Sequence, residues 1–240
     1  MPTLPKIIAV VGPTASGKTA LGAFLAKEFG GEIVSADAKQ VYRGMDIGTA
    51  KEKDLDVPQH LLDIREPGEK ITVGDYQALA YEVIDRLLVE QKLPILVGGS
   101  GLYAESVLEG YVFGGPGTKE KKPRYQSLKL AIDIPRDELK RRARVRLDQR
   151  IDQGLVEEVQ GLLDEGVCPD WLRSCGIEYR YFSSYLIGEI SLEAAREKTA
   201  IATDQFIKRQ YTWWRRHSDL IWVKDIDEAR GLVQPFLERE

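Results

Sequence analysis

The feature that most constrains this chain is a glycine-rich stretch near its start, GPTASGKT at 12–19. It fits the pattern Gly-x-x-x-x-Gly-Lys-Ser/Thr, in which backbone N–H groups turn inward to cradle phosphate oxygens and the next helix adds partial positive charge at its N-terminus. We expect Lys18 to reach the outer phosphate and the Thr19 hydroxyl to ligate Mg²⁺. The candidate diphosphate-binding residues of this loop are Gly12, Pro13, Thr14, Ala15, Ser16, Gly17, Lys18 and Thr19.

The residues around the loop predict an α/β fold. The apolar run at 7–11 is typical of a strand buried on both faces of a parallel sheet, and apolar residues at helical spacing predict a helix at 18–29. Further strands are predicted at 32–36 and 94–97, with a helix at 75–90 between them. This alternation indicates a P-loop NTPase-like parallel sheet flanked by helices.

The second half of the chain has a different texture. Residues 113–124 read FGGPGTKEKKPR, which combines turn residues with charge and is typical of a linker. A last strand is predicted at 128–134, and the remaining pattern is mostly helical. We expect helices near 136–153, 155–165, 178–187, 191–216 and 226–238. The predicted units are a P-loop core at 1–112, a linker at 113–123, and residues 124–240, which add the last core strand and a helical C-terminal part.

Composition excludes several classes of protein. The 240 residues carry 34 Lys and Arg and 38 Asp and Glu, and a net charge of -4 argues against a coat of positive charge for indiscriminate nucleic-acid binding. Two basic stretches, 136–150 and 204–217, are hidden in that average. Cys168 and Cys175 lack zinc-ligand spacing, and the chain starts without the apolar run of a signal peptide. No stretch approaches the roughly 20 apolar residues of a membrane span, so we expect a soluble, cytoplasmic protein.

The phosphate loop does not by itself specify a reaction. A small-molecule kinase, a GTPase-type switch and an enzyme whose substrate carries a diphosphate leaving group all remain open. The switch is disfavoured because the chain contains no Asn-Lys-x-Asp guanine-reading motif. A motor-type ATPase is disfavoured because the strand at 95–97 ends in Gly98-Gly99-Ser100, where such an enzyme places a Mg²⁺-holding Asp.

Asp37 is the one carboxylate that closely follows an early buried strand. Ligands of open α/β sheets bind at the carboxyl ends of strands, so Asp37 is expected to face the same crevice as the phosphate loop. There it would hold Mg²⁺ or take a proton from a nucleophile, with a helix N-cap as the alternative. Gln40 suits the reading of a base edge, and the Ser100 hydroxyl suits donation to a diphosphate oxygen.

Together these stretches resemble the tRNA dimethylallyltransferase family, also called tRNA isopentenyltransferases, as a short member. The phosphate loop is generic, whereas Asp-x-x-Gln-x-Tyr, Gly-Gly-x-Gly-Leu-Tyr and Lys-Arg-Gln-x-Thr-Trp in that order are specific. The resemblance covers most of the chain. Its further stretches are SADAKQVYRGMDIGTAK at 35–51, PQHLLDI at 58–64, LPILVGGSGLY at 93–103, RRARVRLDQRIDQGLVEEV at 141–159, YLIGEISLEAA at 185–195 and IKRQYTWWRR at 207–216.

The resemblance implies roles for particular residues. The loop would hold the diphosphate of dimethylallyl diphosphate, with Mg²⁺ at Thr19 and Asp37, and Asp37 would be the general base toward N6 of an adenine. Ser100 stands where a threonine is usual, and Arg142 and Arg146 match two arginines near the diphosphate and the site entrance. Catalysis would then fall to Asp37, Ser100 and Arg146. Contacts with tRNA would fall to Asp37, Ala38, Lys39, Gln40, Ser100, Lys208, Arg209 and Gln210.

The chain departs from the family pattern at four places. Ala38 replaces a serine, Glu178 replaces a glycine and Asp204 replaces an arginine. The linker at 113–123 stands where family members carry a helical insertion that grips the anticodon stem-loop. The missing insertion keeps a second acceptor open, because relatives that prenylate free adenylate are also short.

The basic stretches bear on that choice. Arg142, Arg146 and Arg150 repeat every four residues and share one helix face, which suits contact with phosphates. Trp213 and Trp214 are expected in the core, as is usual for a late amphipathic helix. We therefore expect a monomeric enzyme that transfers a dimethylallyl group to N6 of adenosine at position 37 in the tRNA anticodon loop. The alternatives are an adenylate dimethylallyltransferase acting on free AMP, ADP or ATP, a small-molecule P-loop kinase, and a non-catalytic tRNA-binding remnant.

Overall fold

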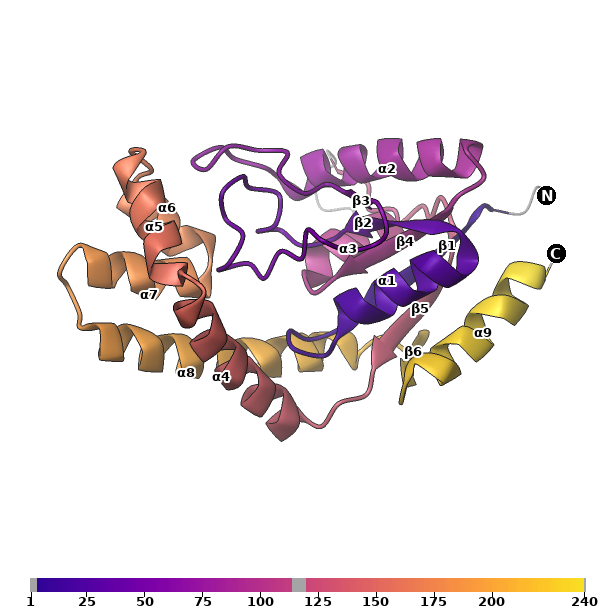
Figure 1. Cartoon of the computed structure of the whole chain (residues 1–240). Coiled ribbons are helices and arrows are strands. Elements are labelled where there is room, and N and C mark those ends of the chain that lie inside the picture. Colours follow the sequence, from indigo (N-terminus) through magenta and orange to yellow (C-terminus); the bar gives the residue numbers. More distant parts are fainter. Residues whose placement is uncertain (1–3, 114–119, 240) are drawn as a thin grey trace.

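A computed structural model of the chain describes residues 4–113 and 120–239 and has at its centre one parallel β-sheet (Figure 1). The strand order is β3-β2-β4-β1-β5-β6, and every neighbouring pair is parallel. Parallel neighbours require crossover connections, which the helices supply on both faces. The strands are β1 (Lys6–Val11), β2 (Gly31–Ser35), β3 (Gln59–His60), β4 (Leu93–Gly98), β5 (Gln126–Ile132) and β6 (Leu220–Val223).

Two layers of helices bury the sheet. Helices α1 (Lys18–Phe29) and α9 (Ile226–Glu238) pack on one face through a core that includes Leu21, Leu25 and Val233. Helices α2 (Val73–Val89) and α3 (Gly101–Leu108) cover the other face together with the end of α8 (Leu192–Trp214). Apart from Lys6, the central strands β1 and β4 consist of apolar residues, as expected for strands that are covered on both faces.

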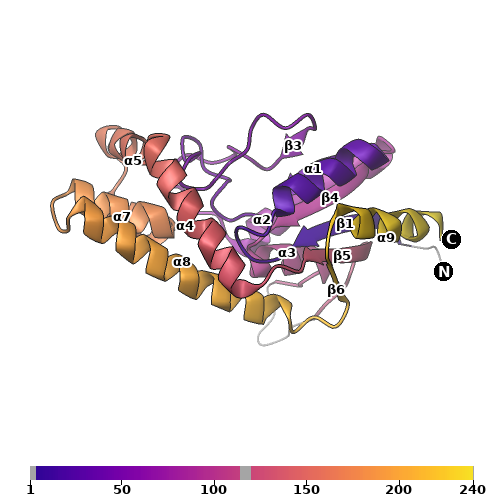
Figure 2. The ribbon, with the colours of Figure 1, turned by 60° about the horizontal axis from the view of Figure 1, so that its bottom comes forward.

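A helical lobe lies beyond the carboxyl ends of the strands (Figure 1). It consists of α4 (Arg136–Asp152), α5 (Leu155–Asp164), α6 (Pro169–Cys175), α7 (Ile177–Leu186) and the first part of α8. Its core joins Tyr179 and Phe182 to Val41 and Met45, which belong to the loop after β2. Helices α4 and α8 lie side by side and lead back to the sheet (Figure 2). The lobe and the sheet are therefore packed around the same loop.

The α/β class and the flanking helices are confirmed. The predicted helix at 18–29 agrees with α1, and most other predicted boundaries lie within two or three residues. Four elements were not predicted: β3, α3, α6 and β6. The predicted linker at 113–123 falls largely on residues 114–119, which lie outside the described residues.

The two tryptophans near the end of α8 occupy core positions, as expected. Trp214 is buried, and the partly buried Trp213 packs against the same core cluster on the α2 and α3 face of the sheet. No helix within residues 4–113 and 120–239 combines the length and the apolar character that crossing a membrane requires.

Candidate active site

The phosphate loop connects β1 to α1 and leaves its polar groups turned inward. Gly12 and Gly17 have φ values of 135° and 88°, which a side chain would strain. Lys18 Nζ donates to the carbonyl of Pro13 at 2.7 Å, and Ser16 Oγ is buried without a partner among the described residues. No side chain in the described part of the chain caps the N-terminus of α1. Free N–H groups, an unpaired hydroxyl and an ammonium in one concavity are the chemistry of a polyanion site.

The environment of Lys18 destabilises its charged ammonium form. Burial, together with the charge of the nearby Arg146, lowers the pKa of Lys18 from its usual 10.5 to about 8, and the charge of Asp37 opposes this shift. A diphosphate placed here would stabilise the ammonium form, because an opposite charge favours ionisation. The phosphate loop therefore favours a bound anion over water.

The ends of β2 and β4 meet beside the loop, as predicted. The Ala38 N–H donates to Ser100 Oγ at 3.1 Å, so that Ser100 ties the two strand ends together. Asp37 Oδ1 accepts the Lys39 N–H at 2.9 Å, which fixes the carboxylate in its own turn and leaves its second oxygen available. A Cβ at Gly98 would collide with the carbonyl of Ala36, so this approach of the strands requires glycine.

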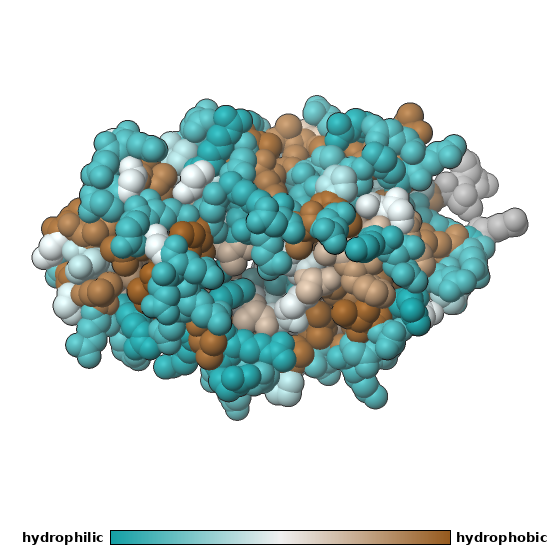
Figure 3. Space-filling model, in the orientation of Figure 1, coloured by the Kyte–Doolittle hydropathy of each residue, from teal (hydrophilic) through white to brown (hydrophobic). Residues whose placement is uncertain are grey.

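The phosphate loop and the ends of β2 and β4 border one cavity of about 150 Å³. Figure 3 shows the surface hollowed between the sheet half and the helical lobe. Lys18 and Asp37 both line the cavity, as the sequence predicted, whereas Ser100 is not among the described residues of its wall. The lining residues are Thr14, Ala15, Gly17, Lys18, Thr19, Ala20, Ile33, Ser35, Asp37, Gln40, Thr49, Ala50, Glu52, Gln59, Val97, Gly98, Gly99, Arg146 and Arg150.

Only one of the two predicted diphosphate arginines reaches this cavity. Arg146 Nη2 donates to Thr14 Oγ1 at 2.5 Å, and burial, with the charge of Arg150, lowers its pKa from 12.5 to about 10. Arg142 instead is exposed and donates to Glu138 at 2.7 Å, outside the lining. Arg142 lies one turn of helix from Arg146, a displacement of about 5–6 Å along the α4 axis. The structure therefore does not bring Arg142 to the cavity with Arg146, and a contact between Arg142 and diphosphate stays a prediction.

Gln210 also differs from its predicted place. Its Oε1 accepts the Thr14 N–H at 2.9 Å and its Nε2 donates to the Gly99 carbonyl at 2.8 Å, so a buried side chain of α8 braces the phosphate loop against the end of β4. Both ends of the amide are engaged inside the protein, so Gln210 braces the loop in this structure, and its contact with RNA stays a prediction. Lys208 and Arg209 are exposed on the same helix and remain available for phosphates.

The Gln40 amide is engaged as well. It accepts from Ser35 Oγ at 3.1 Å and donates to the carbonyls of Thr49 and Ala50 at 3.2 and 3.3 Å. Gln40 therefore joins the β2 end to the 49–50 segment of the cavity wall. A contact between Gln40 and a base requires an exchange of these hydrogen bonds.

The wall formed by the 46–51 segment depends on residues that the sequence did not single out. The carboxylate of Glu158 in α5 accepts the N–H groups of Asp46, Ile47 and Gly48 at 2.8, 2.6 and 3.0 Å. Lys51 has a fully buried side chain that donates to both Asp46 and Asp63. Because Glu158 lies more than 100 residues from its partners, no local pattern signals this contact.

The site suits a divalent metal if a diphosphate supplies further oxygens. Among residues 4–113 and 120–239, no three His, Cys, Asp or Glu side chains gather into a metal centre of their own. The Thr19 hydroxyl and the Asp37 carboxylate do line the same cavity, and oxygen ligands of this kind together with phosphate oxygens are what Mg²⁺ prefers. The donor set therefore fits a metal that arrives with a diphosphate.

Comparison with known proteins gives a consistent answer. The family model for IPP transferase matches residues 40–120 and 115–217, and that for isopentenyl transferase matches 5–62. A protein of Streptomyces coelicolor named tRNA dimethylallyltransferase is 35% identical over 304 aligned positions, which cover 99% of this chain and 97% of the relative. A protein of Pelotomaculum thermopropionicum with the same name is 34% identical, over 91% of this chain and 90% of its own.

Solved structures agree. The tRNA isopentenylpyrophosphate transferase of Bacillus halodurans superposes with a TM-score of 0.86 at 30% identity, over 97% of this chain and 95% of that one. The corresponding enzyme of Staphylococcus epidermidis gives 0.88 at 28% identity, over 98% of this chain and all of that one.

Proposed function

Because the chain belongs to the tRNA dimethylallyltransferase (IPP transferase) family, we propose that it transfers a dimethylallyl group from dimethylallyl diphosphate to N6 of an adenosine in the tRNA anticodon loop, at position 37, and releases diphosphate. The observation that carries this proposal is the cavity in which Lys18 of a phosphate loop and the carboxylate of Asp37 face each other. One end suits a polyanionic leaving group, and the other supplies a base.

The leaving group would be held by the phosphate loop and its neighbours. Lys18, Arg146 and the uncapped N–H groups of α1 stand where negative charge grows as the bond to diphosphate breaks, and preorganised groups of this kind are the strongest single source of catalysis in many enzymes. Thr19 and Asp37 would hold Mg²⁺. When bound, the metal supplies charge neutralisation to the diphosphate oxygens.

Asp37 would act on the acceptor. The N6 nitrogen forms a bond to C1 of the dimethylallyl group, the C–O bond to diphosphate breaks, and the electron pair leaves with the diphosphate. The proton displaced from N6 passes to the free carboxylate oxygen of Asp37. Both substrates are held in one cavity, so orientation contributes a further part of the rate.

The acceptor is the point that experiment must decide. Purified protein is incubated with labelled dimethylallyl diphosphate and Mg²⁺, together with either an anticodon stem-loop RNA or AMP. Label in the RNA alone supports the proposal, because only the polynucleotide presents position 37. Label in AMP alone refutes it in favour of the free-adenylate alternative. Transfer of phosphate from ATP to a small molecule, with no prenyl transfer, would instead support a kinase.

We also propose that the linker at 113–123 replaces an insertion of the family and that the flanking parts form one catalytic unit. Two observations support this. The aligned length of 304 positions exceeds the 240 residues of this chain by 64, and the two matches to the IPP transferase model meet at 115–120. Because the phosphate loop, Asp37 and Arg146 come from one chain, we expect a monomer, and because its substrate is tRNA, we expect it in the cytoplasm.

A further inference from the structure

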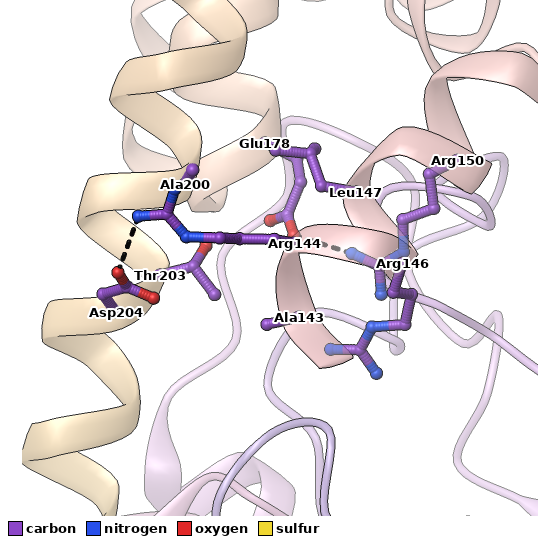
Figure 4. A pocket seen from close by; sticks show the side chains of 9 residues that line it. All are labelled: Ala143, Arg144, Arg146, Leu147, Arg150, Glu178, Ala200, Thr203 and Asp204. Carbon is purple, nitrogen blue, oxygen red and sulfur yellow. Dashed lines mark hydrogen bonds and ion pairs between the residues drawn. The ribbon is translucent and has the colours of Figure 1, made fainter. Parts of the chain in front are cut away.

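A buried ion pair between α4 and α7 forms part of the cavity wall. Arg150 Nη1 donates to Glu178 Oε1 at 2.7 Å and to the Gly48 carbonyl at 3.3 Å. The two side chains are 8% and 18% exposed. Arg150 lines the phosphate-loop cavity and also a small neighbouring cavity between the helices of the lobe (Figure 4). Arg150 therefore borders the cavity, and the charges of both partners act on Arg146, which binds the phosphate loop at Thr14.

The cavity already holds a high density of positive charge. Lys18 and Arg146 line it, and each has a lowered pKa, about 8 for Lys18 and about 10 for Arg146. The charge of Arg150 contributes to the lowering at Arg146, and the charge of Glu178 works against it. Asp37 and Glu52 also line the cavity and offset this charge only in part, so an Arg150 without its partner carboxylate would add a further cation, a cost that an entering polyanion relieves.

We propose that Glu178 limits how tightly the cavity holds diphosphate, by keeping the Arg150 guanidinium paired on the cavity wall instead of free to join Lys18 and Arg146. This inference rests on the proposed function and assigns Glu178 and Arg150 to the diphosphate end of the site. Diphosphate is the leaving group, so it must depart after each turnover. A cavity in which a third cation is free to bind diphosphate would hold the product for longer and slow the cycle.

A second ion pair on the same helix provides a matched control. Arg144 Nη2 lies 3.0 Å from Asp204 Oδ2 of α8, and the side chains are 50% and 23% exposed. Figure 4 shows Arg144 extended toward Asp204, away from the Arg150 and Glu178 pair. Arg144 lines the small cavity but is not among the described residues of the phosphate-loop cavity. Loss of the carboxylate at Asp204 should therefore leave diphosphate binding unchanged.

The test is calorimetric titration of inorganic diphosphate, with Mg²⁺, into the unaltered protein and into the Glu178→Gln and Asp204→Asn variants. The Glu178→Gln variant lacks one negative charge beside a polyanion, so it should bind diphosphate about threefold to tenfold more tightly. Its kcat should fall because the product leaves more slowly. Asp204→Asn should stay within about twofold. General damage to the fold weakens binding, so a gain in affinity separates the proposed role from a structural one.

A double variant keeps the test decisive if Glu178→Gln folds poorly. Replacement of both partners, Arg150→Met with Glu178→Gln, removes the whole buried pair, an exchange that proteins tolerate well. It should return diphosphate affinity to within about twofold of the unaltered protein. Unchanged or weaker binding by folded Glu178→Gln, or tightening that persists in the double variant, would overturn the proposal.

The same titration separates this inference from the proposed function. Absence of diphosphate binding by the unaltered protein would overturn both. Tightening by Glu178→Gln in a protein that prenylates AMP, and not RNA, would refute the proposed acceptor alone and support the role of Glu178.

Discussion

The position of Gln210 yields the sharpest prediction, because its sequence context suggests an RNA contact and its structure shows a brace. We consider Gln210→Met, which keeps an unbranched side chain of similar length and removes both polar atoms. The variant leaves the Gly99 carbonyl and the Thr14 N–H without their partner.

The two losses differ in size. Gly99 also borders the cavity but is buried, so its unpaired carbonyl costs about 1–3 kcal/mol. Thr14 is half-buried and lines the cavity, so water restores part of its hydrogen bond and the loss there is about 0.5–1 kcal/mol. We expect the free energy of unfolding to fall by about 1.5–4 kcal/mol, and diphosphate affinity to fall about tenfold because the loop loses its fixed position.

The matched control is Gln205→Met, the same chemical change at an exposed position five residues earlier on α8. It should change the free energy of unfolding by less than about 0.5 kcal/mol. Urea unfolding followed by circular dichroism measures both variants, and calorimetry measures diphosphate binding. If Gln210→Met unfolds like the control and only its KM for stem-loop RNA rises, Gln210 is an RNA contact and the brace is refuted.

Other variants test the remaining assignments. Asp37→Asn should lower the single-turnover rate of prenyl transfer by about 10²–10⁴-fold at saturating dimethylallyl diphosphate, and near-normal turnover would exclude Asp37 as the base. Since the pKa of Lys18 is lowered to about 8, its ammonium is lost as pH rises through that value, so diphosphate affinity should fall between pH 7 and 9 in the unaltered protein and less steeply in Lys18→Met. The double variant Lys208→Ala, Arg209→Ala should bind the stem-loop RNA more weakly and release about two fewer counterions, measured as the slope of log affinity against log salt concentration. An unchanged slope would place the RNA elsewhere.

Much of the fold is readable from the sequence where local chemistry decides it. Helix α1 begins and ends as predicted because Gly17 and Gly30, at φ 88° and 64°, bracket an apolar helical pattern. The strands β3 and β6 escape prediction because they have two and four residues, and each exists through pairing with a neighbouring strand. A short strand of this kind carries too little periodicity to be recognised.

The candidate site also has one part that the sequence predicts and one part that depends on how distant elements pack. The cavity that brings Lys18 and Asp37 together follows from a general rule about parallel sheets, so the sequence predicts it. The outward position of Arg142 and the inward position of Gln210 depend on how α4 and α8 pack, which residue spacing does not specify. Glu158 was missed for the same reason, since its hydrogen bonds join segments about 110 residues apart.

Helix α8 has a consequence for how this protein can be divided. Its 23 residues form a rod of about 34 Å, with the helical lobe at one end and, at the other, Gln210 on the phosphate loop and Trp213 packed on Gly101. Strands β5 and β6 come from the same late part of the chain. A truncated chain that ends before residue 124 would keep the signature residues of a phosphate site and lack both its brace and a third of its sheet. The phosphate loop here is therefore not a transferable module, and recombination or truncation between the halves should yield chains that carry the motif without the binding.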